Sequence, residues 1–194
     1  KKLAHAFLIE TNDKEKCYQT ILHFLKVLNC PNDYQENCKN CNLCHLIETH
    51  SLPSLLTIYP DGQNIKKEQI LELKRAFQTK PVFSKYNMYI LMDAEYLNSA
   101  SANTMLKFLE EPEEYIIGFF ITNNKENVLD TIKSRCQILL DYYNYDATTD
   151  IPLEYFQMAI SYALEIETVH NEALLYNRET LLPLLKDKKD AFWL

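Results

Sequence analysis

The sequence predicts an α/β fold in which a parallel sheet is sandwiched by helices and followed by a small all-helical domain. Two observations lead to this prediction. Up to about residue 143, short apolar runs typical of buried strands alternate with segments whose apolar residues recur at helical spacing. From residue 152 onward only the helical spacing remains. Because parallel strands need a crossing connection between them, such alternation is typical of a parallel sheet covered on both faces.

The elements before residue 60 follow from two kinds of pattern. Continuous apolar runs such as HAFLI indicate strands that are buried on both faces. Apolar side chains three and four residues apart, such as Ile21, Leu25 and Leu28, indicate a buried helix face. These patterns predict, in chain order, a strand at 4–9, a helix at 15–29, a cysteine-rich segment at 30–45 and a strand at 55–59.

The elements between residues 60 and 140 follow from the same patterns together with helix caps. Ile70 and Leu73 share one helical face. Asn98 or Ser99 can cap a later helix, which Pro112 ends. The predicted elements are a helix at 66–78, a strand at 88–92, the helix between Asn98 and Pro112, a strand at 115–121, a short helix at 127–134 and a strand at 136–140.

The chain is expected to form two domains. Residues 141–150, DYYNYDATTD, are interpreted as a linker between them. We expect a main domain at 1–143, with the cysteine-rich segment inserted in it, and a small helical domain at 144–194. No internal repeat or low-complexity tract interrupts this organisation.

Composition and charge exclude several classes of protein. Of 194 residues, 47% are hydrophobic, and 20 basic side chains face 27 acidic ones, which gives a net charge of −7. An acidic chain is poorly suited to hold a nucleic-acid backbone through its overall field, although a local basic patch stays open. The apolar run at 3–9 is too short for a secretory signal, and no run approaches the ~18 residues of a membrane span. We therefore expect a cytoplasmic protein without membrane contact, whose cysteines are free or metal-bound.

A cluster of cysteines predicts a structural zinc site. Four cysteines lie within fifteen residues in the pattern C-x7-C-x2-C-x2-C: Cys30, Cys38, Cys41 and Cys44. Two-residue gaps let a tight turn aim neighbouring sulfurs at one point, and four thiolates leave no open position for catalysis. The alternatives are free thiols, or His45 as a substitute ligand. Cys17 and Cys136 stand apart and are interpreted as ordinary buried thiols.

Three segments in fixed order carry a resemblance to a known family. AHAFLIE runs into a helix ending LNC before the cysteines, MDAEYLNSASANTMLKFLEEPEE follows, and TIKSRC comes last. Together they resemble the bacterial clamp-loader subunits of DNA polymerase III, members of the AAA+ superfamily, over residues 1 to about 140. The resemblance implies an AAA+ type sheet, a helical lid after it, and a third helical domain, the collar, which we expect to be absent from this chain.

The resemblance also implies that the ATP site of the family is degenerate here. The ATP-hydrolysing gamma/tau subunits carry a P-loop, whose glycines fall on Thr11, Lys14 and Lys16 and whose lysine and threonine fall on Cys17 and Tyr18. These side chains would keep the backbone amides away from a phosphate. We therefore expect no bound nucleotide and no ATPase activity of the chain itself, a pattern that resembles the delta-prime subunits.

The acidic residues of the site differ from the family pattern as well. Asp93 stands where the family holds magnesium, but Ala94 follows it instead of the glutamate that activates water. Glu95 comes one position later, and we expect it on the opposite side of an extended strand end.

Arg135 within SRC is the expected functional residue. By resemblance it acts in trans as an arginine finger on ATP bound to a neighbouring gamma/tau subunit. The alternative is a charge favoured by a helix end. The implied partners are the gamma/tau and delta subunits and, through the assembled complex, the sliding clamp and primer-template DNA. The polymerase activity of the holoenzyme would lie on other subunits.

Two other functions compete with this hypothesis. One is an ATP-hydrolysing gamma/tau-type subunit with a divergent P-loop, against which the missing glycines, lysine and threonine count. The other is a zinc-dependent nucleic-acid-binding module, against which the acidic charge and the lack of aromatic residues interleaved with basic ones count.

Overall fold

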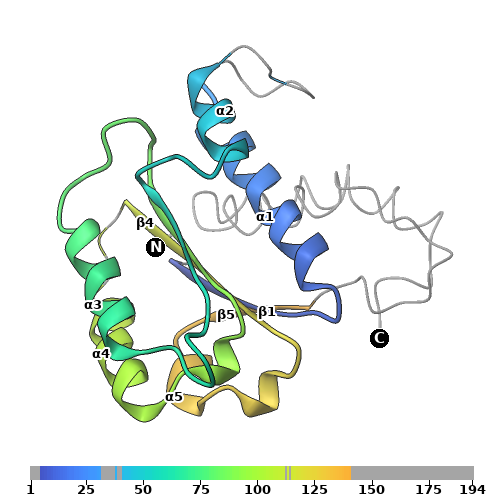
Figure 1. Cartoon of the computed structure of the whole chain (residues 1–194), viewed down its shortest axis with the longest axis vertical. Coiled ribbons are helices and arrows are strands. Elements are labelled where there is room, and N and C mark those ends of the chain that lie inside the picture. Colours follow the sequence, from blue (N-terminus) through green and yellow to red (C-terminus); the bar gives the residue numbers. More distant parts are fainter. Residues whose placement is uncertain (1–4, 32–37, 39–40, 112, 114, 141–194) are drawn as a thin grey trace, which may run out of the picture. The chain divides into compact units, whose positions relative to one another are not determined.

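The computed structural model describes residues 5–31, 38, 41–111, 113 and 115–140 (Figure 1). The predicted linker at 141–150 and the predicted helical domain at 144–194 lie outside the described residues and stay predictions.

Within the described part of the chain the strands form one parallel sheet of five strands, in the order β2-β3-β4-β1-β5. The strands are β1 (Ala6–Glu10), β2 (Leu55–Ile58), β3 (Asn87–Leu91), β4 (Ile116–Thr122) and β5 (Gln137–Leu140). The predicted parallel sheet is therefore confirmed, and each predicted strand agrees with the structure to within two residues. β1 lies between β4 and β5, with Phe7 beside Phe119 on one side and Gln137 on the other.

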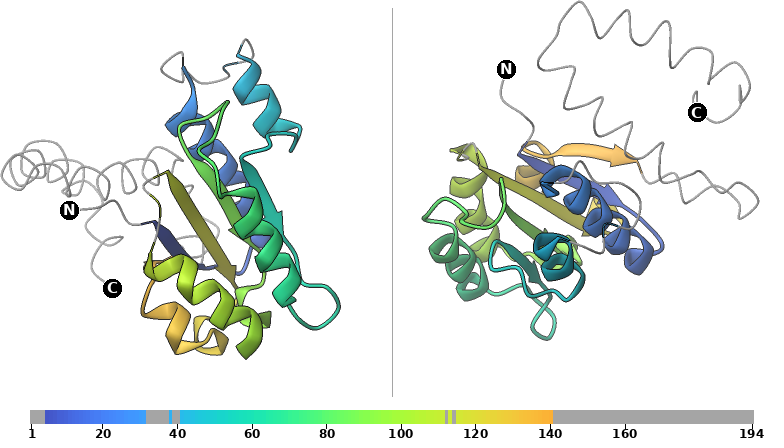
Figure 2. Two further views of the ribbon diagram at one scale, coloured as in Figure 1. Left: turned by 90° about the vertical axis from the view of Figure 1, so that its left-hand side faces the viewer. Right: turned by 90° about the horizontal axis from the view of Figure 1, so that it is seen from above.

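Helices cover both faces of the sheet (Figures 1 and 2). The helices are α1 (Lys14–Asn29), α2 (Asn42–Glu48), α3 (Lys67–Ala76), α4 (Ser99–Glu110) and α5 (Asp130–Lys133), with 3-10 turns η1 (Ala94–Tyr96) and η2 (Lys125–Asn127). On one face, sheet residues such as Leu8 and Leu91 form a core with α3, α4 and α5. On the other, Phe119 stacks on Phe7 and meets the edge of Phe24 from α1. Every residue of β3 and β4 is buried, which explains their continuous apolar runs.

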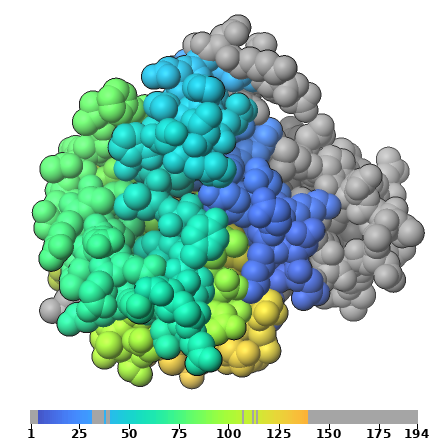
Figure 3. Space-filling model, viewed as in Figure 1, coloured from blue at the N-terminus to red at the C-terminus, as the bar shows by residue number. Residues whose placement is uncertain are grey.

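Two elements differ from the sequence-based expectation. α2 was not predicted; it begins at Asn42 with Cys41 as its N-cap and lies beside α1, as the cyan and blue side chains show in Figure 3. The helix predicted at 127–134 is instead the 3-10 turn η2 followed by the single turn of α5. The interruption comes from Val128 and Leu129, whose backbones are extended (ψ 137° and 132°).

Candidate functional site

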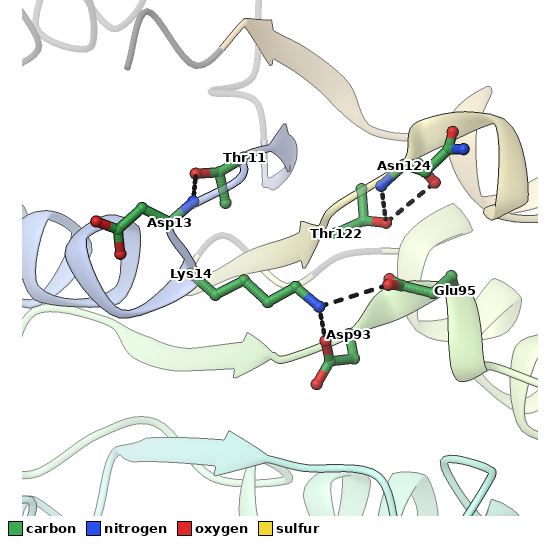
Figure 4. A network of polar contacts seen from close by, with 7 residues as sticks. All are labelled: Thr11, Asp13, Lys14, Asp93, Glu95, Thr122 and Asn124. Carbon is green, nitrogen blue, oxygen red and sulfur yellow. Dashed lines mark hydrogen bonds and ion pairs between the residues drawn. The ribbon is translucent and has the colours of Figure 1, made fainter. Parts of the chain in front are cut away.

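The junction between β1 and α1 lies at the carboxyl edge of the sheet and contains only residues 11–13. Thr11 is fully buried, and its N–H donates to the carbonyl of Thr122 at the end of β4 (2.8 Å). Its hydroxyl oxygen accepts a hydrogen bond from the Asp13 N–H (3.0 Å) (Figure 4). Thr11 thus joins the junction to the sheet. Its hydroxyl also accepts from the Asp13 N–H, a backbone amide of the kind that a phosphate loop offers to its ligand.

Asp13 caps the N-terminus of α1. Its carboxylate accepts from the Lys16 N–H (2.9 Å), and its carbonyl accepts from the Cys17 N–H (3.0 Å). Helix N-termini attract anions because their amides are unpaired and the helix dipole is positive there. An acidic side chain of the chain itself holds that position. The sequence analysis missed Asp13, although an aspartate directly before a helix is a recognisable capping signal.

Lys14 extends from the first turn of α1 toward the end of β3, where it forms ion pairs with two carboxylates (Figure 4). Its Nζ is hydrogen-bonded to Asp93 and lies 3.6 Å from Glu95 Oε1. Burial alone would lower the pKa of the Lys14 ammonium, but the hydrogen bond to Asp93 and the charge of Glu95 outweigh it, so that this pKa is raised. Lys14, expected only as a loop residue that keeps phosphate away, thus has two carboxylate partners in the structure.

The expectation that Glu95 lies at an extended strand end is wrong. The strand does not continue through this segment: β3 ends at Leu91, and Asp93 adopts the left-handed conformation (φ 55°, ψ 56°). The 3-10 turn η1 follows, and both carboxylates, that of Asp93 before the turn and that of Glu95 within it, pair with Lys14 (Figure 4).

The remaining P-loop positions lie apart from this network. Lys16 is exposed on α1, whereas Cys17 and Tyr18 are buried. The Tyr18 hydroxyl is within hydrogen-bond distance of His50 Nδ1 (3.0 Å) and Thr57 Oγ1 (3.1 Å). The two residues that stand at the family's lysine and threonine positions are therefore packed into the fold.

A second ion pair lies at the same edge of the sheet. Glu10, the last residue of β1, accepts from the Lys125 N–H (3.1 Å), and its other oxygen lies 3.2 Å from Lys125 Nζ. The backbone hydrogen bond lowers the pKa of the Glu10 carboxyl most; burial opposes this effect, and the Lys125 side chain adds to it. Nearby, the Thr122 hydroxyl donates to the Asn124 carbonyl (3.1 Å) and accepts from its N–H (3.1 Å).

The structure brings the four predicted zinc ligands together. All their sulfur atoms lie within 4.8 Å of one another, with the Cys30 Sγ 3.6 Å from Cys38 Sγ and 3.9 Å from Cys41 Sγ. Cys30 ends α1, Cys41 caps α2, and Cys44 lies in its first turn. Three of the cysteines are buried and Cys38 is half-buried. His45 is exposed and does not belong to the cluster.

These distances fit a tetrahedral zinc ion. Sulfur ligands at about 2.3 Å from zinc would lie roughly 3.8 Å apart. The Cys44 N–H donates to Cys41 Sγ (3.3 Å), a contact that stabilises a thiolate ligand. Burial raises the pKa of the Cys44 thiol, and its neighbours Cys41 and Cys30 raise it further, so that without a cation the cluster disfavours the ionised form. The donor set therefore suits a metal ion that neutralises thiolates.

Arg135 lies two residues past the end of α5, after the C-cap Ser134, and its side chain is 33% exposed. The guanidinium Nη1 donates to the Thr131 carbonyl (2.9 Å) and to Ser134 Oγ (3.3 Å), and Nη2 donates to Glu110 Oε1 (2.6 Å). Glu110 is the last residue of α4, and its pairing with Arg135 was not predicted because no local pattern indicates it. The neighbouring Cys136 is half-buried, which raises the pKa of its thiol to about 12.

The described helices include none that is long and apolar enough to cross a membrane. The sequence was also matched by the model of a known protein family. The model of the family described as "DNA polymerase III, delta subunit" matches residues 1–140.

Individual relatives are of two kinds. The chain is 36% identical over 138 residues to DNA polymerase III subunit delta' of Bacillus subtilis, covering 71% of this chain and 42% of that protein. It is 31% identical over 136 residues to subunit tau/gamma of Haemophilus influenzae, covering 70% of this chain and 20% of that protein. The chain thus spans less than half the length of either relative.

A solved structure supports the fold. A gamma subunit-related protein from Thermotoga maritima superposes with a TM-score of 0.59 at 22% identity, covering 98% of this chain and 59% of that one. The family match extends over 140 of the 194 residues, more than half of the chain. This chain belongs to the DNA polymerase III delta subunit family.

Proposed function

We propose that this chain is the core of a delta-prime-type subunit of the DNA polymerase III clamp loader, which helps to load the sliding clamp on primed DNA during replication in the cytoplasm. In this function it binds no nucleotide itself. Relatives named delta' and relatives named tau/gamma both match the sequence. The choice between the two kinds therefore depends on the site.

The observation that carries the proposal is the β1–α1 junction. A P-loop presents free backbone amides, a lysine and a magnesium-binding hydroxyl to the phosphates. Here the amides of Asp13 and Lys16 donate to Thr11 and to the Asp13 carboxylate, so an anion of the chain itself caps the helix N-terminus. Lys14 faces two carboxylates. The junction favours a subunit without ATP over a gamma/tau-type ATPase.

Arg135 supplies the activity that such a subunit retains. In the assembled loader its guanidinium reaches the terminal phosphate of ATP on a neighbouring gamma/tau subunit, where a fixed cation stabilises the charge that builds up during phosphoryl transfer. Its partial exposure and its anchoring by Thr131 and Glu110 suit this use, because a guanidinium held in one orientation loses little freedom on meeting a phosphate.

The cysteine cluster has a structural function in this proposal. One zinc ion on the four thiolates would close the segment between α1 and α2. The partners are the gamma/tau and delta subunits, and the clamp and DNA are reached through the assembled complex. A zinc-dependent nucleic-acid-binding module is the remaining alternative, and binding to primed DNA by the isolated subunit, measured at two salt concentrations, tests it.

The proposal is tested by titrating the subunit with ATP and magnesium in a calorimeter and by reconstituting the loader with gamma/tau and delta subunits of the same organism. We expect no heat of ATP binding by the isolated subunit, and clamp loading only when the subunit is included. Stoichiometric ATP binding with hydrolysis by the subunit alone would instead identify a gamma/tau-type ATPase.

A further inference from the structure

Three charged side chains converge where α1 begins and β3 ends. The Lys14 ammonium contacts Asp93 and lies 3.6 Å from Glu95 Oε1, and the side chains of the three residues are 27%, 25% and 9% exposed (Figure 4). Within the described part of the chain, the buried Oε2 of Glu95 has no hydrogen-bond partner. Glu95 is thus a nine-tenths buried carboxylate whose charge is balanced mainly by one lysine.

The two carboxylates depend on a cation between them. Like charges that are partly removed from water repel each other strongly unless an opposite charge lies nearby. Asp93 also holds a left-handed backbone conformation (φ 55°), which is uphill for a residue other than glycine and persists only where surrounding contacts maintain it. Its ion pair with Lys14 is such a contact. The triad therefore joins α1 to the turn after β3.

The chemistry of the carboxylate pair is that of a hard-cation site. Magnesium and manganese prefer carboxylate oxygens and keep several water ligands, so that two converging carboxylates suffice to hold one such ion. The space between them is filled by the lysine. A surface ion pair such as Lys66–Asp61, whose side chains are 52% and 60% exposed, contributes little by comparison, because water screens it.

We propose that Lys14 is a built-in cation, which occupies the place of a divalent metal ion between Asp93 and Glu95, and that removing its ammonium turns this pair into a divalent-cation site. The inference deepens the proposed function and rests on it, since a subunit that bound ATP would receive a magnesium ion together with the nucleotide. Its test uses no nucleotide, and the two can fail separately.

The first measurement is manganese binding in the absence of nucleotide. Binding is monitored through the electron paramagnetic resonance signal of free Mn²⁺. We expect Lys14→Met, which keeps the length of the side chain and removes the charge, to bind Mn²⁺ at least about tenfold more tightly than the wild type. Adding Asp93→Asn to this variant should abolish the gain. Lys66→Met, which breaks the exposed pair with Asp61, serves as the matched control and should leave Mn²⁺ binding unchanged.

The second measurement is the midpoint of thermal unfolding, Tm. Lys14→Met should lower Tm by several degrees, and Mn²⁺ should restore part of this loss in the variant without affecting the wild type. If Lys14→Met does not fold, neutralising its partners as well, in Lys14→Met/Asp93→Asn/Glu95→Gln, should recover a cooperative transition. Recovery supports the inference, because it traces the loss of folding to uncompensated carboxylates.

Two results would overturn the inference: a folded Lys14→Met that binds Mn²⁺ no better than the wild type, or a neutralised triple variant that is no more stable than Lys14→Met. ATP binding by the wild-type subunit would overturn the proposed function alone. In that case a gain of Mn²⁺ binding in Lys14→Met would still establish Lys14 as the resident cation of the site.

Discussion

Arg135 Nη2 lies 2.6 Å from Glu110 Oε1, and this ion pair joins the end of α4 to the segment just past α5 although the two residues are 25 positions apart. The same guanidinium also donates to the Thr131 carbonyl of α5. Three hydrogen bonds thus fix a side chain that is one-third exposed. An arginine held in this way is presented in one orientation before any partner arrives.

Arg135→Ala should reduce ATP hydrolysis by the assembled loader while leaving the fold and subunit assembly intact. An arginine finger raises the rate of ATP hydrolysis roughly 10³-fold or more at the one site that it reaches. The total rate of the loader should fall only in part, because the other ATP sites receive arginines from other subunits. Arg135→Lys should restore little, since an ammonium lacks the planar fork. Steady-state ATPase assays measure the effect, with Lys133→Ala as the control, and an unchanged rate in Arg135→Ala would leave this residue as a helix-end charge.

Protein purified without added metal should contain about one zinc ion per chain by elemental analysis. Cys41→Ala should lose that zinc, because three thiolates remain and the N-cap of α2 is removed. Limited proteolysis should then cut within residues 30–50 sooner than within the sheet. Cys17→Ala, at a buried cysteine outside the cluster, should keep its metal. Retention of zinc and protease resistance in Cys41→Ala would contradict the assignment.

Gly118→Ala should destabilise the sheet through a clash with Tyr89. Gly118 lies in β4 beneath the Tyr89 ring, and a Cβ added there would stand 1.9 Å from Tyr89 Cζ. Both residues are buried, so the ring has little room to move, and such overpacking costs about 1–3 kcal/mol or more. Urea unfolding measures the loss. In a Tyr89→Leu background the same substitution should cost clearly less, and an equal cost in both backgrounds would place its cause elsewhere.

The Glu10–Lys125 pair should make stability sensitive to acid. Since the pKa of folded Glu10 lies below its ordinary value of 4.5, its contribution is fully present above pH 4.5 and is lost as the pH falls through the folded pKa. Glu10→Gln should therefore be less stable than the wild type at pH 7, and the difference should shrink as the pH falls below 4.5. Urea midpoints across this range measure it. A difference that is constant with pH would show that the carboxylate charge is not involved.

The parts of the fold that could be predicted are those in which a local pattern decides the outcome. β3 and β4 are continuous apolar runs because both faces of each strand are buried. Asn98 caps α4 because its side-chain oxygen accepts hydrogen bonds from the first amides of the helix, a preference that is visible in the sequence. α2 was missed because a seven-residue helix that carries two of the clustered cysteines is too short to show a clear period. The order of the strands depends on long-range pairing, which no local pattern encodes.

The site shows the same division. The four cysteines were predicted from their spacing, since ligands of a compact metal site lie near one another in sequence. The position of Glu95 was wrong because it depends on one left-handed residue, Asp93, which the sequence does not mark as a turn. The pairing of Glu110 with Arg135 arises only after two helices have packed, and no signal in either segment announces it.

If the proposed function holds, the early start of α1 makes the construction of an ATP site in this chain a problem of epistasis. Putting glycine at positions 11, 14 and 16, lysine at 17 and threonine at 18 would restore the P-loop letters. Positions 14 and 16 already belong to the first turn of the helix, however, and Asp13 would still cap it through the backbone amide of residue 16. Glycine at these two positions would weaken the helix by roughly 1 kcal/mol each without opening a loop, so these substitutions cost stability unless the cap and the start of the helix change with them.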